Sequence, residues 1–238
     1  MLITCAWGRS IRGNFVLVLI LLAALLTPAF GQASQINCYN EGIALAEQGK
    51  YDEAIEYFDS AIKINPQDAK VWYNKGLVLF LQGEYAEAID AYNNAINLNP
   101  QDANAWYNMG VALYIQGEYD QALQAFDKAV ELNPQYADAW DNKGNVLYSQ
   151  GKYDEAINAY NRSIDINPQS AEAWCNKGNA LNELRKYDQA LLASDKAVEI
   201  NPQLAEAWNC KGIALKALGR TTEADSAFAK AKELGYTG

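Results

Sequence analysis

Apolar residues recur at helical spacing along most of this chain, and residues 69–102 show the pattern clearly. Trp72, Gly76 and Leu79 fall at i, i+4 and i+7, which places them on one face of a first helix. Between residues 85 and 96, apolar and tyrosine residues recur at steps of three and four, which is one face of a second helix. The segment is therefore predicted to hold two amphipathic helices.

Two breaks bound these helices. Gly83 follows the first, and glycine readily adopts the left-handed conformation needed after a helix end. Asn99 precedes Pro100, whose ring disfavours a helical conformation at the residue before it. Residues 69–102 are thus predicted to form a helical hairpin. At the start of four second helices we expect an aspartate N-cap: Asp52, Asp120, Asp154 and Asp188.

The hairpin recurs with a fixed period of 34 residues. The tripeptide Asn-Pro-Gln marks each period, with its asparagine at Asn65, Asn99, Asn133, Asn167 and Asn201. Counting back from each proline gives six repeats: 35–68, 69–102, 103–136, 137–170, 171–204 and 205–238. Such a period indicates a repeat architecture, in which each hairpin buries its apolar face against its neighbours.

Small residues stand at the same places in every repeat. Glycine occupies place eight: Gly42, Gly76, Gly110, Gly144, Gly178 and Gly212. Alanine occupies place twenty: Ala54, Ala88, Ala122, Ala156, Ala190 and Ala224. Because a glycine inside a helix costs about 1 kcal/mol relative to alanine, six glycines in register predict a close approach of the two helices. Bulky side chains such as Trp72 would fill the space around them.

This pattern resembles the tetratricopeptide repeat family, with Trp at place four, Gly at eight, Ala at twenty, an aromatic at twenty-four and Pro at thirty-two. The resemblance covers residues 35–238. It implies an all-α, right-handed superhelix of six antiparallel helix pairs, whose first helices line a concave groove that holds peptides or partner proteins. Two departures stand out: Cys38 replaces the first tryptophan, and Ser194 replaces the fifth aromatic, where we expect a packing gap.

In that family the groove is built from places two, five, six, nine, twelve and thirteen of the first helices. Place six is asparagine in five successive repeats: Asn40, Asn74, Asn108, Asn142 and Asn176. An amide is both donor and acceptor, so this row could pair with the backbone of an extended peptide. The alternative is that these asparagines only solvate the groove.

The remaining groove places change character along the chain. The first three repeats contribute apolar and tyrosine side chains, among them Tyr73, Leu77, Phe80, Tyr107 and Tyr114. The last three contribute polar and acidic ones, including Asp138, Asp141, Asn145, Glu172, Asn179, Glu183 and Glu206. This favours a ligand that is apolar at one end and basic at the other, although the aromatics could equally pack between neighbouring helices.

The N-terminal residues 1–31 have the three parts of a secretory signal peptide. Arg9 and Arg12 precede a 12-residue apolar run, and small residues follow the run. Cleavage is expected at 31/32, or alternatively at 33/34. The run is shorter than the ~20 residues that span a bilayer, so an uncleaved membrane anchor is the less favoured alternative. We therefore expect a secreted or extracytoplasmic protein.

Composition narrows the function further. The net charge is −10, which disfavours nucleic acid and anionic lipid as partners. The absence of histidine removes the commonest general base and metal ligand, so we expect no catalytic residue, metal site or cofactor. An enzyme would have to use carboxylates such as Asp138, Asp141 and Glu172. Cys175 and Cys210 could face the groove, and with Cys38 they are expected to be free thiols.

Together these features predict an exported, non-catalytic scaffold that binds a protein or peptide in a concave groove. The alternative is a structural component of the cell envelope that assembles by self-association.

Overall fold

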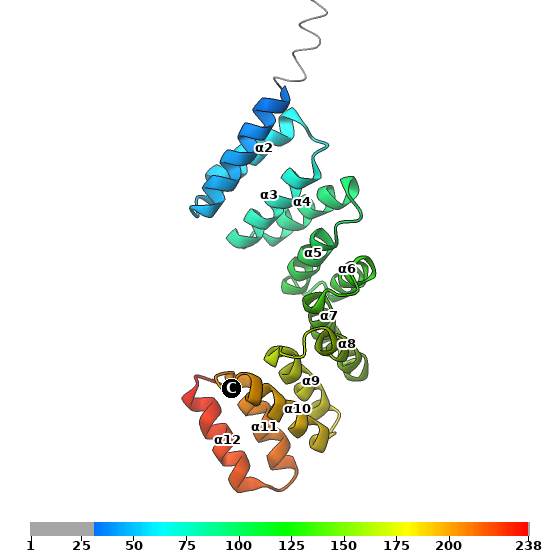
Figure 1. Ribbon diagram of the computed structural model, residues 1–238, viewed down its shortest axis with the longest axis vertical. Helices are drawn as coiled ribbons and strands as arrows, with labels where there is room; N and C mark the ends of the chain where they lie inside the picture. Colours follow the sequence, from blue (N-terminus) through cyan, green and yellow to red (C-terminus); the bar gives the residue numbers. More distant parts are fainter. Residues whose placement is uncertain (1–30, 238) are drawn as a thin grey trace, which may run out of the picture. The chain divides into compact units, whose positions relative to one another are not determined.

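The computed structural model describes residues 31–237, and every regular element in that range is a helix (Figure 1). The chain divides into two compact parts after Leu98. We call residues 31–98 the N-terminal part and residues 99–237 the C-terminal part, and describe each by itself. The predicted signal peptide lies outside the described residues, apart from Gly31. Within residues 31–237 no helix is long and apolar enough to cross a membrane.

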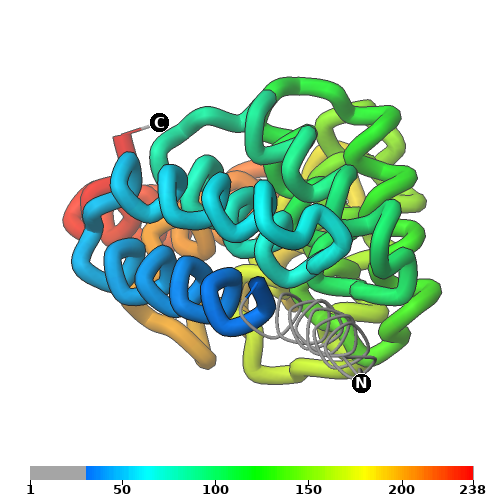
Figure 2. The backbone as a smooth tube through the Cα atoms, turned by 90° about the horizontal axis from the view of Figure 1, so that it is seen from above, coloured from blue at the N-terminus to red at the C-terminus, as the bar shows by residue number. Residues whose placement is uncertain are grey.

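The N-terminal part holds two helical hairpins. Its helices span residues 31–47, α2 Tyr51–Ile64, α3 Ala69–Gln82 and α4 Tyr85–Leu98. The helix of residues 31–47 lies beside α2 (Figure 2), where Tyr39 and Ile43 pack against Phe58. The helix α3 packs on both α2 and α4.

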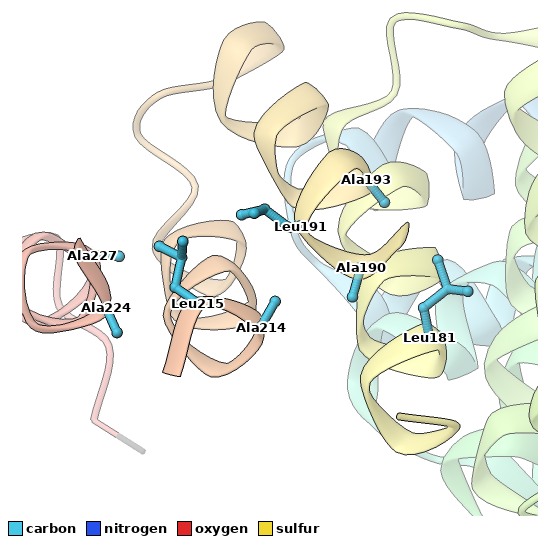
Figure 3. Packing of buried hydrophobic residues seen from close by; sticks show 8 residues of the cluster. All are labelled: Leu181, Ala190, Leu191, Ala193, Ala214, Leu215, Ala224 and Ala227. Carbon is cyan, nitrogen blue, oxygen red and sulfur yellow. The ribbon is translucent and has the colours of Figure 1, made fainter. Parts of the chain in front are cut away.

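The C-terminal part repeats the hairpin four times. Its helices are α5 Ala103–Ile115, α6 Tyr119–Leu132, α7 Ala137–Ser149, α8 Tyr153–Ile166, α9 Ala171–Glu183, α10 Tyr187–Ile200, α11 Ala205–Ala217 and α12 Thr221–Glu233. Each helix packs on the next, and the first helices α5, α7, α9 and α11 also touch in succession. One apolar cluster runs from α9 to α12 through Leu181, Leu191 and Leu215 (Figure 3). The predicted all-α fold of stacked helix pairs is confirmed.

The Asn-Pro turn between repeats is held by side-chain hydrogen bonds. Asn65 Oδ1 accepts from the backbone N–H of Gln67 at 3.1 Å, and Asp68 caps α3 by accepting from Lys70 N at 3.1 Å. Trp72 Nε1 donates to the carbonyl of Pro66 at 3.0 Å. The same indole-to-proline bond recurs for Trp106, Trp140, Trp174 and Trp208. Tryptophan at place four is therefore both a packing residue and a lock on the preceding turn.

The glycines at place eight lie against the aromatic rings at place twenty-four. A Cβ on Gly76 would lie 2.7 Å from the ring of Tyr92, and one on Gly110 would lie 2.8 Å from Phe126. Real Cβ atoms essentially never approach ring carbons this closely. The predicted close approach of the two helices is thus confirmed, but the side chain nearest to Gly76 is the ring of Tyr92 and not the expected Trp72.

The expected packing gap at Ser194 is filled. The Sγ of Cys210, from the following repeat, lies 2.8 Å from where a Cβ on Gly178 would be. Cys210 is fully buried, and Ser194 is buried with its hydroxyl donating to the carbonyl of Leu191 at 3.0 Å. A thiol from the neighbouring repeat therefore takes the space that an aromatic ring occupies elsewhere, and the prediction of a gap is wrong.

The predicted aspartate N-caps are also wrong. The second helices begin at Tyr51, Tyr119, Tyr153 and Tyr187, one residue before each aspartate. The N-cap residues make no side-chain hydrogen bond to the helix. The aspartates instead lie in the first turn, where a negative charge interacts favourably with the helix dipole.

We expect Gly110→Ala to destabilise the protein by roughly 1–2 kcal/mol, because overpacking against Phe126 outweighs the gain in helix propensity. Urea unfolding of the full chain measures the change. The double variant Gly110→Ala with Phe126→Leu should cost less than the sum of the two single changes, since the smaller side chain makes room for the methyl group. Additive costs would contradict a direct glycine–ring contact.

Candidate functional site

The candidate site is the face of the first helices that carries places two, five, six, nine, twelve and thirteen, which we call the first-helix face. In the N-terminal part it lies on α3 and the helix of residues 31–47. In the C-terminal part it lies on α5, α7, α9 and α11, each of which contacts the next.

The asparagines of place six hold neighbouring first helices together. Asn74 Nδ2 donates to the hydroxyl of Tyr39 at 3.1 Å and to the carbonyl of Lys70 at 2.8 Å. The corresponding bonds of Asn142 join it to the Tyr107 hydroxyl and the Asp138 carbonyl, both at 3.1 Å. Each amide therefore bonds place five of the preceding repeat and a carbonyl of its own helix.

This geometry changes what the row can offer a ligand. Both N–H groups of Asn74 are used internally, while its Oδ1 takes no hydrogen bond from the described residues. Asn176 Nδ2 likewise donates to the carboxylate of Asp141, at 3.2 Å. Asn40 is exposed, and Asn108 is half-buried and also partnered. The row thus fixes the surface, and at Asn74 it is the carbonyl oxygen that remains available as an acceptor.

The predicted groove aromatics are half-buried and pack against rings of their own repeats. Ring centroids lie 6.1 Å apart for Tyr73 and Tyr92, 5.3 Å for Phe80 and Tyr85, 5.9 Å for Tyr107 and Phe126, and 5.7 Å for Tyr114 and Tyr119. Leu77 is also half-buried. The more exposed apolar side chains lie at place thirteen, where Leu81 is 62% and Ile115 47% exposed. The aromatic residues of the groove places therefore serve partly to pack the helices together. Leu81 and Ile115 are the more accessible apolar side chains.

A hollow of about 100 Å³ opens on the first-helix face of the C-terminal part. Its lining is polar and aromatic: Tyr114, Asn145, Tyr148, Tyr160, Asn176 and Asn179. The Tyr160 hydroxyl donates to Asn145 Oδ1 at 2.9 Å. Sequence reasoning misses Tyr148, although place twelve, which it shares with Phe80 and Tyr114, is the signal that could have found it.

Acidic groups surround this hollow. The pKa of Asp141 is raised to about 6, and burial is the main cause. The hydrogen bonds from Asn176 and Asn145 lower this pKa, and the charges of Asp138 and Glu172 raise it by less than burial does. Asp138, Glu172 and Glu206, all at place two, are exposed. The first-helix face of the C-terminal part therefore presents negative charge to a ligand.

The cysteines at places five and six offer no exposed thiol to this surface. Cys175 and Cys210 are buried, and they and Cys38 are free thiols, as expected. Burial, followed by the charges of Glu206 and Glu172, raises the pKa of Cys175 to about 12. A thiol in that environment stays protonated at neutral pH and is a poor nucleophile.

Comparison with known proteins identifies this architecture. Family profiles described as tetratricopeptide repeat match residues 39–103, 103–136, 171–204, 125–158 and 193–225, and one described as TPR repeat matches 144–184. No curated protein matches the chain.

Solved structures share the fold. One of MamA is 28% identical with a TM-score of 0.68, covering 73% of this chain and 94% of that one. One of YrrB, described as a TPR protein with an unusual peptide-binding site, is 25% identical with a TM-score of 0.64, covering 75% and 92%. The Pseudomonas aeruginosa pilF structure, 20% identical with a TM-score of 0.72, covers 87% and 95% and agrees in fold.

Two tyrosines at place twenty-four provide a matched test of packing. The buried hydroxyl of Tyr92 has no hydrogen-bond partner among the described residues, because Leu77 stands where Asn145 serves Tyr160. We expect Tyr92→Phe to stabilise the chain by about 1 kcal/mol and Tyr160→Phe to destabilise it by about 1 kcal/mol. Urea unfolding at neutral pH measures both, and effects of the same sign would contradict this hydrogen-bond assignment.

The raised pKa of Asp141 predicts a pH-dependent stability. The folded state holds the proton more tightly than the unfolded state, so this stabilisation is complete below about pH 4 and is lost as pH rises through about 6. Asp141→Asn should therefore be more stable than the parent above about pH 6, by up to about 3 kcal/mol. Thermal unfolding across roughly pH 4–8 should show this advantage shrinking towards the acidic end. An advantage independent of pH would be inconsistent with the assignment.

Proposed function

Since the chain belongs to the tetratricopeptide repeat family, we propose that it is a non-catalytic scaffold that binds an extended segment of a partner protein on the first-helix face. The observation that carries the proposal is the asparagine row. It holds the face rigid through bonds such as Asn142 to Tyr107, at 3.1 Å. A surface that is ordered before binding loses less entropy when a flexible segment docks.

The chemistry of the face indicates the kind of segment. In the C-terminal part, Ile115 provides an exposed apolar contact, and Asp138, Glu172 and Glu206 provide exposed negative charge. A segment with apolar and basic residues is complementary to both. The described peptide-binding site of YrrB supports peptide recognition by a relative of this fold.

Export is part of the same proposal. The basic, apolar and small-residue segments of residues 1–31 support it, and a secreted or envelope protein would meet its partner outside the cytoplasm. N-terminal sequencing of the protein isolated from its host tests this, with a new N-terminus at Gln32 or Ser34 as the expected result. An intact N-terminus would favour a retained anchor or an internal protein.

The binding proposal is tested by changing charge without changing shape. The variant Asp138→Asn, Glu172→Gln, Glu206→Gln removes three exposed carboxylates from the first-helix face. Its matched control is Glu155→Gln, Asp188→Asn, Asp225→Asn, which removes three exposed carboxylates from the second helices α8, α10 and α12. Alanine changes in the asparagine row are unsuitable, because those amides hold the helices together.

The parent and both variants serve as baits for proteins from the native host. We expect a partner retained by the parent and by the control, and bound about tenfold or more weakly by the first-helix variant. Equal retention of the partner by all three baits would show that the binding site does not depend on these carboxylates of the first-helix face, and would contradict the proposal. Absence of any partner, together with concentration-dependent sedimentation of the parent, would favour self-association instead.

A further inference from the structure

A second recess lies away from the first-helix face, between α9 and α10. It encloses about 440 Å³ and is lined by Trp174, Lys177, Leu181, Leu192 and Lys196 among others. Figure 3 shows Leu181 on α9 and Ala193 on α10, two residues of its wall. On α9 the recess uses places four, seven and eleven, none of which belongs to the first-helix face. We call it the α9–α10 pocket.

The preceding repeat contains an equivalent recess that differs in its charges. This α7–α8 pocket, about 300 Å³, is lined by Trp140, Lys143 and Arg162 and by the carboxylates Asp127 and Glu155. Lys143 is bound to Asp127 at 2.6 Å. Its cations are therefore balanced by acids within the pocket.

In the α9–α10 pocket the corresponding acids are missing. The place of Asp127 is taken by Asn161, and that of Glu155 by Gln189. The pocket keeps its two cations, Lys177 and Lys196, and has no carboxylate in its lining. In a chain with a net charge of −10, this is a local positive site.

Lys177 is the unbalanced cation. Its counterparts Lys75, Lys143 and Lys211 each bind an aspartate of the preceding repeat, at 2.6–2.7 Å. The Lys177 ammonium lies 4.9 Å from the Trp174 ring centroid and forms no ion pair within residues 31–237. Burial lowers its pKa, against the more distant charge of Asp165, which raises it. A half-buried cation without a close counter-ion gains when an anion binds it.

The rim of the pocket is apolar where other repeats are polar. Leu192 is 70% exposed, and it stands at place twenty-two. The other repeats have polar side chains there: Glu56, Asp90, Gln124, Asn158 and Ser226. Lys196, on the same helix, pairs with Glu199 at 2.9 Å on the surface. The exposed Leu192 therefore lines the same pocket as Trp174 and Lys177, the lysine that forms no ion pair within the described residues.

We propose that the α9–α10 pocket is a second docking site, for a peptide segment of a partner protein in which a carboxylate stands next to a large apolar side chain. The carboxylate binds Lys177, and the apolar side chain covers Trp174, Leu181 and Leu192. The volume lies within the range of about 300–1,000 Å³ of ligand pockets. The site prefers the opposite charge to that preferred by the first-helix face, so the two surfaces bind different segments.

Two fluorescein-labelled peptides test the proposal with the full chain. The acidic probe is Gly-Ser-Glu-Leu-Phe-Glu-Ser-Gly, and its twin has glutamine in place of both glutamates. Fluorescence anisotropy should show the acidic probe binding about tenfold more tightly than its twin. Lys177→Met should abolish this preference while keeping the aliphatic stem. Leu192→Gln should weaken the binding of both probes.

Matched controls distinguish the α9–α10 pocket from the α7–α8 pocket and from the first-helix face. Lys143→Met changes the paired lysine of the α7–α8 pocket and should leave both affinities unchanged. The first-helix variant Asp138→Asn, Glu172→Gln, Glu206→Gln should bind the acidic probe as tightly as the parent or more tightly. A negative result for the α9–α10 pocket would therefore not contradict the proposal for the first-helix face. A negative result for the first-helix face would likewise not contradict the proposal for the pocket.

Three results would overturn the proposal. One is equal affinity for the two probes, and another is an equal effect of Lys143→Met and Lys177→Met. The third is absence of binding up to about 1 mM of the acidic probe. Cosedimentation with vesicles of equal parts phosphatidylcholine and phosphatidylglycerol completes the test. If the parent binds the vesicles but neither peptide, and Lys177→Met abolishes the vesicle binding, the pocket is a lipid site and the peptide proposal is wrong.

Discussion

The close contact between a glycine in the first helix and a ring in the second is the constraint on which the rest of the array depends. With no side chain at Gly76 or Gly110, the rings of Tyr92 and Phe126 reach the backbone of the facing helix. This sets the separation within each hairpin and lets a 34-residue unit close on itself. Where the ring is missing, at Ser194, Cys210 takes its place against Gly178. The contact is therefore maintained even where the chemistry changes.

Hairpins fixed in this way can be stacked in register by a few directional bonds. The indole of each tryptophan at place four bonds the preceding proline carbonyl, as Trp208 does with Pro202 at 2.9 Å. The asparagines at place six bond place five of the preceding repeat, as Asn74 does with Tyr39. These bonds use polar groups that would otherwise be open to a ligand. The first-helix face is thus ordered before a ligand binds, but some of its hydrogen-bond donors, such as the Asn74 amide, are no longer available to the ligand.

The sequence was sufficient to predict the hairpins, their period and the close approach of the two helices at the glycines, because each depends on spacing within one repeat. It did not predict that the ring at place twenty-four, and not the tryptophan at place four, lies against the glycine. It was insufficient where a contact joins different places of two repeats. The filling of the Ser194 gap by Cys210 is one such case, and the use of the Asn142 amide by Tyr107 is another. The N-caps failed for a different reason, since an aspartate in the first turn and one at the cap give nearly the same sequence signal.

Variation among the repeats is concentrated where packing does not dictate the residue. Place eight is always glycine because a ring or a thiol excludes anything larger. Place nineteen varies between Glu and Gln, place twenty-five between Asp, Asn and Ala, and place twenty-two differs in every repeat. At those places the surroundings of the α9–α10 pocket lack two carboxylates and include Leu192. Long-range attraction by a chain of net charge −10 favours basic ligands. An acidic segment can therefore be held only at short range, where the Lys177 ammonium lies close to the ligand and Trp174 and Leu192 add apolar contacts. One array can thus present charge of both signs on separate surfaces, because its repeats share a backbone and differ in their side chains.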